Sequence, residues 1–311
     1  MTDQGVTRHQ HFAMATVFEI IVAGEDSVFA KQAASAAFQE IDRIELELSR
    51  YLPNSDVSRI SNLSPHQSVK VGLDVLQCLQ VALECWKDTG KAFDPTVGSL
   101  VDCWLGKDKS LLQPDSDILH HAHERIGMHL LDLHESTHEV SVGDVVPQID
   151  LGAIGKGYAV DRGGDLLREW GVNAALVHGG TSSAYAFGEY PGGGGWPVTL
   201  SAPGAGGKIL QRVSLRDQSL SGSGTGKALH IIDPRTGRPI STRRAAWVCS
   251  DSAARSDAVS TACMVMTHEE IARYCGAHPH TWAVLIEAGN SGHPDPVFRF
   301  GAGAFDEGVP S

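Results

Sequence analysis

The chain has no long hydrophobic run, although 42% of its 311 residues are hydrophobic. A helix needs about 20 consecutive apolar residues to cross a bilayer, and no run here approaches that length. The first ten residues lack the basic and then apolar plan of a signal peptide, and no lipid-acceptor cysteine follows them. We therefore expect a cytoplasmic protein that does not insert into a membrane.

Cysteine patterns that bind zinc or exchange disulfides are also missing. The six cysteines contain no C-x-x-C pair, and several lie in apolar runs that are typical of helices or strands. Such cysteines are more often reduced and buried than paired or metal-bound. We expect six free thiols.

Positive charge is scarce. The chain has 25 Lys and Arg residues against 37 Asp and Glu, which gives a formal net charge of −12. This balance argues against nucleic acid or an anionic membrane as the main partner. An anionic ligand would need local compensation from a lysine, a helix N-terminus or a metal ion.

A nucleophile elbow and the familiar nucleotide-binding motifs are absent, yet one glycine-rich stretch, residues 146–161, stands out. There is no G-x-S-x-G nucleophile elbow. The stretch is predicted to run from a short apolar strand through a glycine turn with Lys156 into a helix. It is no Walker A loop, because Asp150 and Gly157 stand where Gly and Ser or Thr are needed, and its glycines are spaced G-x-x-G-x-G. The combination of a carboxylate, flexible backbone and a cation predicts a phosphate-binding corner.

The periodicity of the chain predicts an α+β fold with mixed, largely antiparallel sheets flanked by helices. Strands and helices alternate irregularly, and neither an internal repeat nor a linker is visible. We expect one large domain over residues 12–300, with flexible termini at 1–11 and 301–311. The predicted strands are Ala13–Val22 and 174–177, and a final hairpin is predicted over 282–300. The predicted helices cover 26–49, 73–88 and 256–266, and a further helix follows the glycine-rich turn and ends at residue 170. A Ser/Gly loop is predicted over 219–226.

Three further clusters could carry chemistry, and each has a plainer interpretation. His230, before Ile231-Ile232-Asp233-Pro234, could act as a general base or could be a strand histidine before a turn. Asp257 and Thr261 would share one helix face and could bind a hard cation, or Asp257 could be a solvated or capping aspartate. Ala92-Phe93-Asp94 could be a simple turn with a core phenylalanine. A magnesium ion whose coordination is completed by ligand phosphates would offset the negative charge of an anionic ligand in this acidic protein.

Taken together, these pieces resemble the ApbE-type FAD:protein FMN transferases. The ordered matching segments extend from about residue 12 to 290; they are residues 14–16, 49–51, 54–56, 92–98, 150–161, 230–237 and 256–262. The resemblance implies an ApbE-like domain with an FAD cleft. It also implies a Mg²⁺-dependent enzyme that cleaves FAD, moves FMN onto a Ser or Thr of a target flavoprotein and releases AMP.

The same resemblance implies roles for individual positions. FAD would be contacted by Met14, Tyr51, Ala92, Phe93, Asp94, Asp150, Lys156 and Ile231. Mg²⁺ would be held by the Ala153 carbonyl and the side chains of Asp257 and Thr261, with Ser260 as a further contributor. His230 and Asp257 are the catalytic candidates.

Two other functions stay open. Some relatives hydrolyse FAD to FMN and AMP, and a flavin-binding protein without catalysis is a third possibility, which the presence of Asp257, Thr261, Lys156 and His230 argues against. The chain departs from the family at Thr181-Ser182-Ser183, where Asn or Asp commonly follows two glycines, and in the short Ser/Gly segment 221–226. These departures affect the expected acceptor recognition more than the expected FAD or metal binding.

Overall fold

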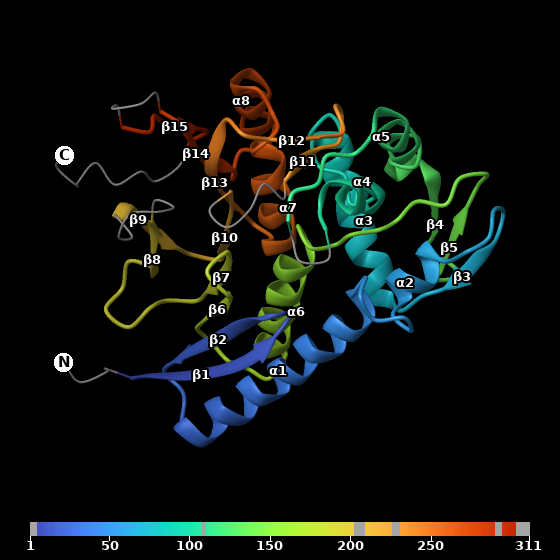
Figure 1. Cartoon of the computed structure of the whole chain (residues 1–311). Helices are drawn as coiled ribbons and strands as arrows, with labels where there is room; N and C mark the ends of the chain where they lie inside the picture. Colours follow the sequence, from blue (N-terminus) through green and yellow to red (C-terminus); the bar gives the residue numbers. More distant parts are fainter. Residues whose placement is uncertain (1–4, 107–109, 202–208, 226–230, 290–293, 303–311) are drawn as a thin grey trace.

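An eight-stranded antiparallel sheet organises the part of the chain that the computed structural model describes, residues 5–106, 110–201, 209–225, 231–289 and 294–302 (Figure 1). The strands lie in the order β1-β2-β6-β7-β10-β13-β14-β15. Their bounds are Val6–Ala13, Thr16–Ala23, Ala175–Gly179, Ser183–Phe187, Gln218–Gly224, Arg243–Ser250, Trp282–Glu287 and Val297–Phe300. The α+β class and the largely antiparallel pairing are confirmed.

Both faces of the sheet are buried, as the side-chain alternation in β2 illustrates. Phe18 and Ile20 belong to the larger core cluster on one face, whereas Ile21 and Ala23 belong to a second cluster on the other. The second face is covered by a hairpin of β8, Trp196–Ser201, and β9, Ile209–Leu215. Trp196 is fully buried in this second core.

Four helices belong to the layer on the first face. They are α1, Ser27–Leu48; α6, Gly155–Glu169; α7, Ala253–Cys263; and α8, His268–Ala277. Helix α1 runs below β1 and β2 in Figure 1 and packs against α6, which in turn packs against α7. Asp26 caps α1, and Thr267 and Glu270 form a capping box at the start of α8.

The remaining elements lie beside this layer, to the right in Figure 1. A three-stranded sheet has the order β3-β5-β4, and a two-stranded ribbon pairs β11 with β12. The strands are Ser68–Lys70, Leu131–His134, Glu139–Val142, Ile232–Asp233 and Arg238–Pro239 for β3, β4, β5, β11 and β12. The helices are Asp56–Ser61, Leu73–Asp88, Gly98–Trp104 and Ser116–His123 for α2, α3, α4 and α5, with a 3₁₀ turn η1 at Met128–Leu130. Helix α3 packs against α7.

Three expectations from the sequence are wrong in detail. Strand β1 begins at Val6, so part of the expected N-terminal tail is an edge strand whose polar side chains hid it. Residues 146–151 form no sheet strand; Gln148 makes an isolated bridge to Val97, and the Asp150 N–H donates to the Pro95 carbonyl. The expected Ser/Gly loop is largely strand β10, because its serine side chains bond to α7. The end of the expected C-terminal tail, from residue 303, lies outside the described residues.

The cysteines behave as expected, since all six are free and five of them are buried. Burial raises the pKa of Cys249 to about 12 and that of Cys275 to about 11. In the described ranges, no helix combines the length and apolar character that crossing a membrane requires.

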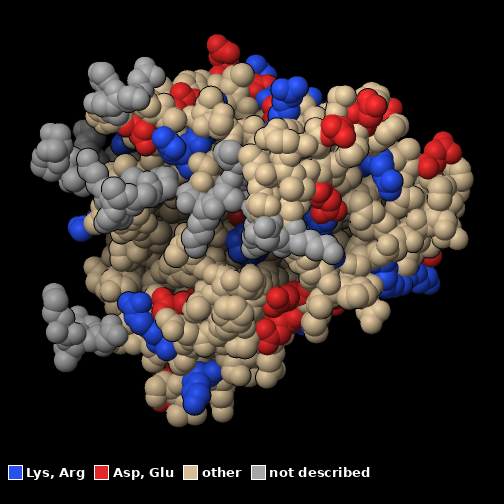
Figure 2. Space-filling view, viewed as in Figure 1, with Lys and Arg blue, Asp and Glu red and all other residues tan. Residues whose placement is uncertain are grey.

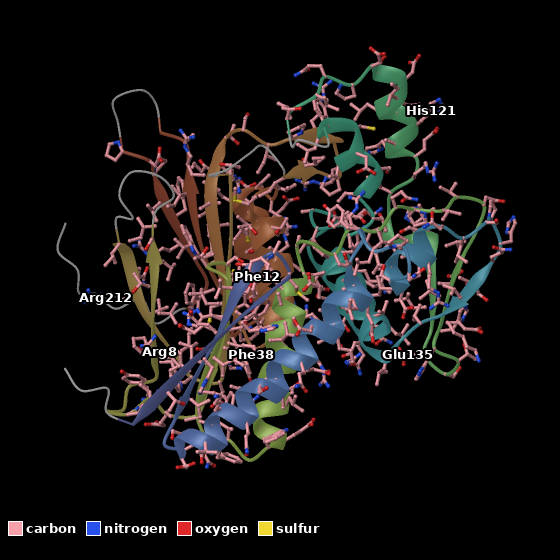
Figure 3. The ribbon with its side chains drawn as sticks, turned by 60° about the horizontal axis from the view of Figure 1, so that its bottom comes forward. Arg8, Phe12, Phe38, His121, Glu135 and Arg212 are labelled. Carbon is pink, nitrogen blue, oxygen red and sulfur yellow. The ribbon has the colours of Figure 1, made fainter. Side chains whose placement is uncertain are left out.

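Two phenylalanines on neighbouring strands test this layering. Phe18 is 0% exposed in the core, whereas Phe12, labelled near the end of β1 in Figure 3, is 69% exposed. We expect Phe18→Ala to lower the free energy of unfolding by about 3–5 kcal/mol, because it leaves a cavity. Phe12→Ala should change it by no more than about 0.5 kcal/mol. Urea denaturation measures both, and equal losses would contradict the assigned burial.

Candidate functional site

The glycine-rich stretch forms the turn before α6 and the first half of that helix. Lys156, in the first turn, directs its ammonium group back along the turn and donates to the Gly152 carbonyl over 3.1 Å. The same Nζ lies 3.7 Å from Oδ2 of Asp257 on α7. The structure therefore brings together Lys156 and Asp257, two of the residues predicted from separate parts of the sequence.

Helices α6 and α7 touch through their backbones at Gly157. A Cβ at this position would lie 2.1 Å from the Ala253 carbonyl oxygen, so only glycine permits the contact. The Gly157 N–H, one of the donors that a helix N-terminus leaves without an intrahelical partner, donates to Asp257 Oδ2 over 3.1 Å. Asp257 is 2% exposed, so α6 supplies both a hydrogen bond and a nearby cation to a buried carboxylate.

Asp161 makes the reciprocal connection from α6 to the N-terminus of α7. Its carboxylate accepts the N–H groups of Ala253 and Ala254 at 2.7 and 2.9 Å, and the hydroxyl of Ser252 at 2.8 Å. Burial, opposed by these donors, raises the pKa of Asp161 to about 6. Each helix thus contributes an aspartate that binds the N-terminus of the other.

The donor set beside Lys156 suits a magnesium ion. Asp257 Oδ1 has no hydrogen bond to the described residues, and Thr261 lies one helical turn further along α7. Ala153 is in the turn before α6, where its half-buried position is compatible with a carbonyl ligand. All of these donors are oxygens, and no cluster of three His, Cys, Asp or Glu residues competes for a metal within the described ranges. Mg²⁺ prefers a site with few protein oxygens, where phosphate and water complete its coordination.

Arg50 contacts the carboxylate that precedes the glycine turn. Its guanidinium donates to Asp150 and to Asp102, in each case over 2.8 Å. The Asp150 carboxylate also accepts the Gly152 N–H over 2.9 Å, which fixes the turn. Tyr51, next in the chain, is 83% exposed, with the Arg50 guanidinium 5.7 Å from its ring centre. The exposed ring is free to contact a ligand, so a packed loop tyrosine is excluded.

The other predicted FAD contacts are mostly buried. Ala92 and Phe93 lie in the core, and Asp94 is buried with its carboxylate bonded to Trp86 and Thr96. Burial raises the pKa of Asp94 despite these bonds. Its position indicates that Asp94 holds the turn together.

Met14 and Ile231 lie far apart in the sequence, and both contact the large core. Met14 adopts a left-handed conformation in the β1–β2 turn, and its N–H donates to Glu45 over 2.7 Å. Ile231 is buried next to β11. His230 lies outside the described residues, so its role stays a prediction.

One metalloprotease-like spacing in the chain carries no metal site. His134-Glu135-Ser136-Thr137-His138 has the spacing H-E-x-x-H, which binds zinc when it lies on a helix. Here it spans the turn between β4 and β5, and His134 Nε2 bonds to the Ser141 hydroxyl over 2.9 Å. The two histidines do not share a helical face.

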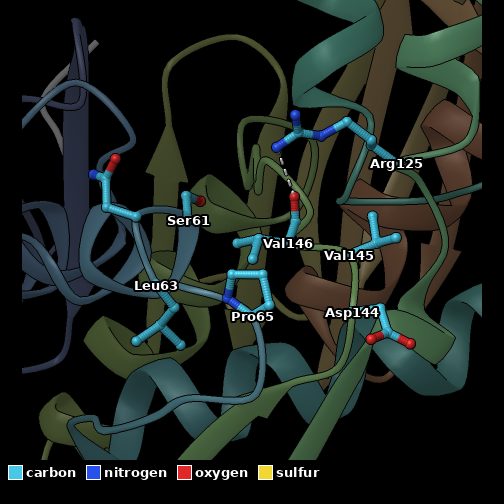
Figure 4. Close-up of a pocket in the computed structure, with 8 residues that line it drawn as sticks. Ser61, Leu63, Pro65, Arg125, Asp144, Val145 and Val146 are labelled. Carbon is cyan, nitrogen blue, oxygen red and sulfur yellow. Dashed lines mark hydrogen bonds between the residues drawn. The ribbon is translucent and has the colours of Figure 1, made fainter.

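A cavity of about 490 Å³ lies beside the start of the glycine-rich stretch (Figure 4). It is lined by Ser61, Asn62, Leu63, Pro65, Arg125, Asp144, Val145 and Val146. The Arg125 guanidinium donates to the Val146 carbonyl over 3.0 Å, as the dashed line shows. None of the predicted FAD or metal residues lines this cavity.

Charge on the visible surface is mixed. In Figure 2, acidic and basic side chains are interspersed on the face shown, and its described residues form no broad basic surface.

Three residues with structural roles at the site were not assigned by sequence reasoning. Arg50 and Asp161 lie inside segments that were noticed, and Ser223, described below, lay in an expected loop. For Asp161 the sequence shows only a carboxylate about two turns into a helix that begins with glycine. That position does not reveal which other helix Asp161 contacts.

The chain is similar to known proteins over most of its length. A family model described as the ApbE family matches residues 14–286. The FAD:protein FMN transferase of Chlamydia muridarum (strain MoPn / Nigg) is 28% identical over 265 residues, covering 80% of this chain and 81% of that protein. The FAD:protein FMN transferase of Treponema pallidum (strain Nichols) is 29% identical over 310 residues, covering 90% of this chain and 84% of that protein.

Solved structures share the fold. The ApbE protein from Thermotoga maritima superposes with a TM-score of 0.84 at 23% identity, covering 95% of this chain and 97% of that one. The flavin transferase ApbE from Vibrio cholerae has a TM-score of 0.83 at 22% identity, with the same coverage. At these identities the likeness establishes a common architecture.

Two glycines in the first turn of α6 test the helix contact. A Cβ at Gly157 would overlap Ala253, whereas a Cβ at Gly155 would meet Leu48 at an ordinary 3.7 Å. We expect Gly157→Ala to lower the free energy of unfolding by about 2 kcal/mol or more through overpacking. Gly155→Ala should leave it unchanged or raise it by up to about 1 kcal/mol, because alanine favours the helix. Urea denaturation compares them, and two equally stable variants would refute the backbone contact.

Proposed function

Since the chain belongs to the ApbE family, we propose that it is an FAD:protein FMN transferase. In this reaction FAD is cleaved, FMN is transferred to a Ser or Thr hydroxyl of an acceptor flavoprotein, and AMP is released. The observation that carries the proposal is the approach of Lys156 to Asp257 within 3.7 Å, where the N-terminus of α6 meets α7. This arrangement combines a cation with a carboxylate that could hold a metal ion, which together suit a pyrophosphate.

The residues for Mg²⁺ would be Asp257, Thr261 and the carbonyl of Ala153. The ion would supply Lewis-acid stabilisation of charge on the phosphate oxygens. Its fit rests on the all-oxygen donor set and on the second Asp257 oxygen, which is left over after Gly157 binds the first. Ser260 donates its hydroxyl to the backbone carbonyl of Asp257, so we assign it a supporting role.

Lys156 would bind the phosphate oxygens of FAD, and its charge would offset that of the departing AMP. Asp150, held by Arg50, would present a carboxylate to the substrate at the glycine turn. Met14, Tyr51, Ala92, Phe93, Asp94 and Ile231 are the other proposed FAD contacts. Of these, Tyr51 offers an exposed ring against which the flavin can stack.

The transfer itself is a displacement at phosphorus. The acceptor hydroxyl oxygen forms a bond to the phosphorus of the FMN half, and the bond between that phosphorus and the bridging oxygen of AMP breaks. A base must take the hydroxyl proton, and His230 is our proposed base. If water replaced the hydroxyl, the same site would hydrolyse FAD to FMN and AMP.

The test is to incubate the protein with FAD and Mg²⁺, with and without a candidate acceptor flavoprotein. We expect AMP release together with flavin that stays bound to the denatured acceptor, and both should require Mg²⁺. AMP release that is independent of the acceptor would establish the hydrolase instead. Intact FAD in every reaction would refute both.

Variants of the metal residues sharpen this test. We expect Asp257→Ala and Thr261→Val to lower Mg²⁺-dependent AMP release by about 100-fold or more, because loss of a metal ligand removes several kcal/mol of transition-state stabilisation. The matched control is Asp251→Ala, which removes an exposed carboxylate just before α7. Unchanged turnover in folded Asp257→Ala would overturn the metal assignment.

A further inference from the structure

Strand β10 and helix α7 meet through a row of hydroxyl groups. Side chains two residues apart on a strand point to the same face, and those four apart on a helix lie one above the other. We name the resulting set the serine ladder; it comprises Ser219, Ser221 and Ser223 on β10 and Ser256 and Ser260 on α7. Four of its members are fully buried, and Ser223 is half-buried at the end nearest Thr261.

The rungs at Ser256 and Ser260 share two contacts, and Ser256 also accepts a hydrogen bond from Ser219 over 3.1 Å. Ser256 donates to the Ala253 carbonyl over 3.1 Å and lies 2.8 Å from the Ser221 hydroxyl. Ser260 donates to the Asp257 carbonyl over 2.9 Å and lies 2.8 Å from the Ser223 hydroxyl. Only Ser223 makes a further contact to a proposed metal ligand, because its oxygen lies 2.8 Å from Thr261 Oγ1.

Counting protons fixes the direction of this chain of hydrogen bonds. Each hydroxyl has one proton to donate, and a carbonyl oxygen can only accept. The Ser260 proton goes to the Asp257 carbonyl, so the proton between Ser223 and Ser260 belongs to Ser223. The proton between Ser223 and Thr261 must then belong to Thr261.

We propose that Ser223 is a positioning residue that orients the Thr261 hydroxyl for metal binding. With its proton donated to Ser223, Thr261 keeps its lone pairs available, whereas a freely rotating hydroxyl would also direct its proton toward the cation. The proposal rests on the proposed Mg²⁺ site. It adds a residue from a different strand to that site, and this residue acts through Thr261 without touching the metal.

Ser221 provides a matched control for the general stabilising effect of the ladder. It makes the same contact to a helix serine over the same 2.8 Å, but its partner Ser256 bonds to no proposed metal ligand. A loss that came only from weaker packing of α7 on β10 would therefore appear in both variants. A loss that came from the Thr261 hydroxyl would appear only when Ser223 is changed.

The experiment measures binding of Mn²⁺, as a paramagnetic substitute for Mg²⁺, to the full chain by electron paramagnetic resonance. We expect Ser223→Ala to weaken Mn²⁺ binding about 10-fold, the usual cost of losing a group that orients a ligand. Ser221→Ala should bind like the wild type, and Ser223→Thr, which keeps the hydroxyl, should retain most of the affinity. Urea denaturation of the two alanine variants checks that both are folded.

The outcomes separate this proposal from the one on which it rests. If the wild type binds Mn²⁺ and Ser223→Ala binds it equally well, the role of Ser223 is refuted and the proposed function stands. Equal weakening of Mn²⁺ binding in Ser221→Ala and Ser223→Ala would show that the ladder only packs α7 against β10, and would also refute the role of Ser223. Failure of the wild type to bind Mn²⁺ would overturn the metal site and this role together.

Discussion

The contact between the backbones of α6 and α7 determines where every proposed metal ligand on α7 lies. Gly157 allows the approach, its N–H binds Asp257, and Asp161 returns the interaction by binding the N-terminus of α7. Because both connections join a carboxylate to helix N–H groups, neither helix can rotate or slide without leaving polar groups unpaired. The serine ladder fixes the other side of α7 against β10. The helix is therefore held by directional bonds on two sides.

This arrangement also indicates how an acidic protein could accommodate the proposed pyrophosphate. The net charge of −12 opposes anion binding in general, but the site concentrates Lys156 and the N-terminus of α6 at one point. The nearest carboxylates already have partners, since Asp257 binds Gly157 and Asp150 binds Arg50. Their negative charge is thus partly compensated before any ligand arrives. Local compensation, and not overall charge, would set the ligand preference of the proposed site.

Local sequence patterns were sufficient for much of the fold and for the residue types of the site. Helical periodicity located α1 and α3 to within a residue or two, and the pairing of Asp257 with Thr261 followed from helix spacing. The edge strand β1 was missed because its alternation is largely polar, and β10 was taken for a loop because serine and glycine are common in loops. Those serines form a strand because α7 supplies partners for their hydroxyls. That information lies more than 30 residues away in the sequence, in Ser256 and Ser260.

The reciprocal binding of the two helix N-termini has a consequence for the order in which the chain can assemble. Gly157 and Asp257 are 100 residues apart, and Asp161 is 92 residues from Ala253. Closing such a long loop costs chain entropy before any contact is made, so this pairing belongs to the slow, non-local part of folding. During synthesis the Lys156 corner leaves the ribosome long before α7 does. An incomplete chain that ends before residue 253 therefore carries the glycine turn but neither the buried carboxylate nor the hydroxyl that would complete the site.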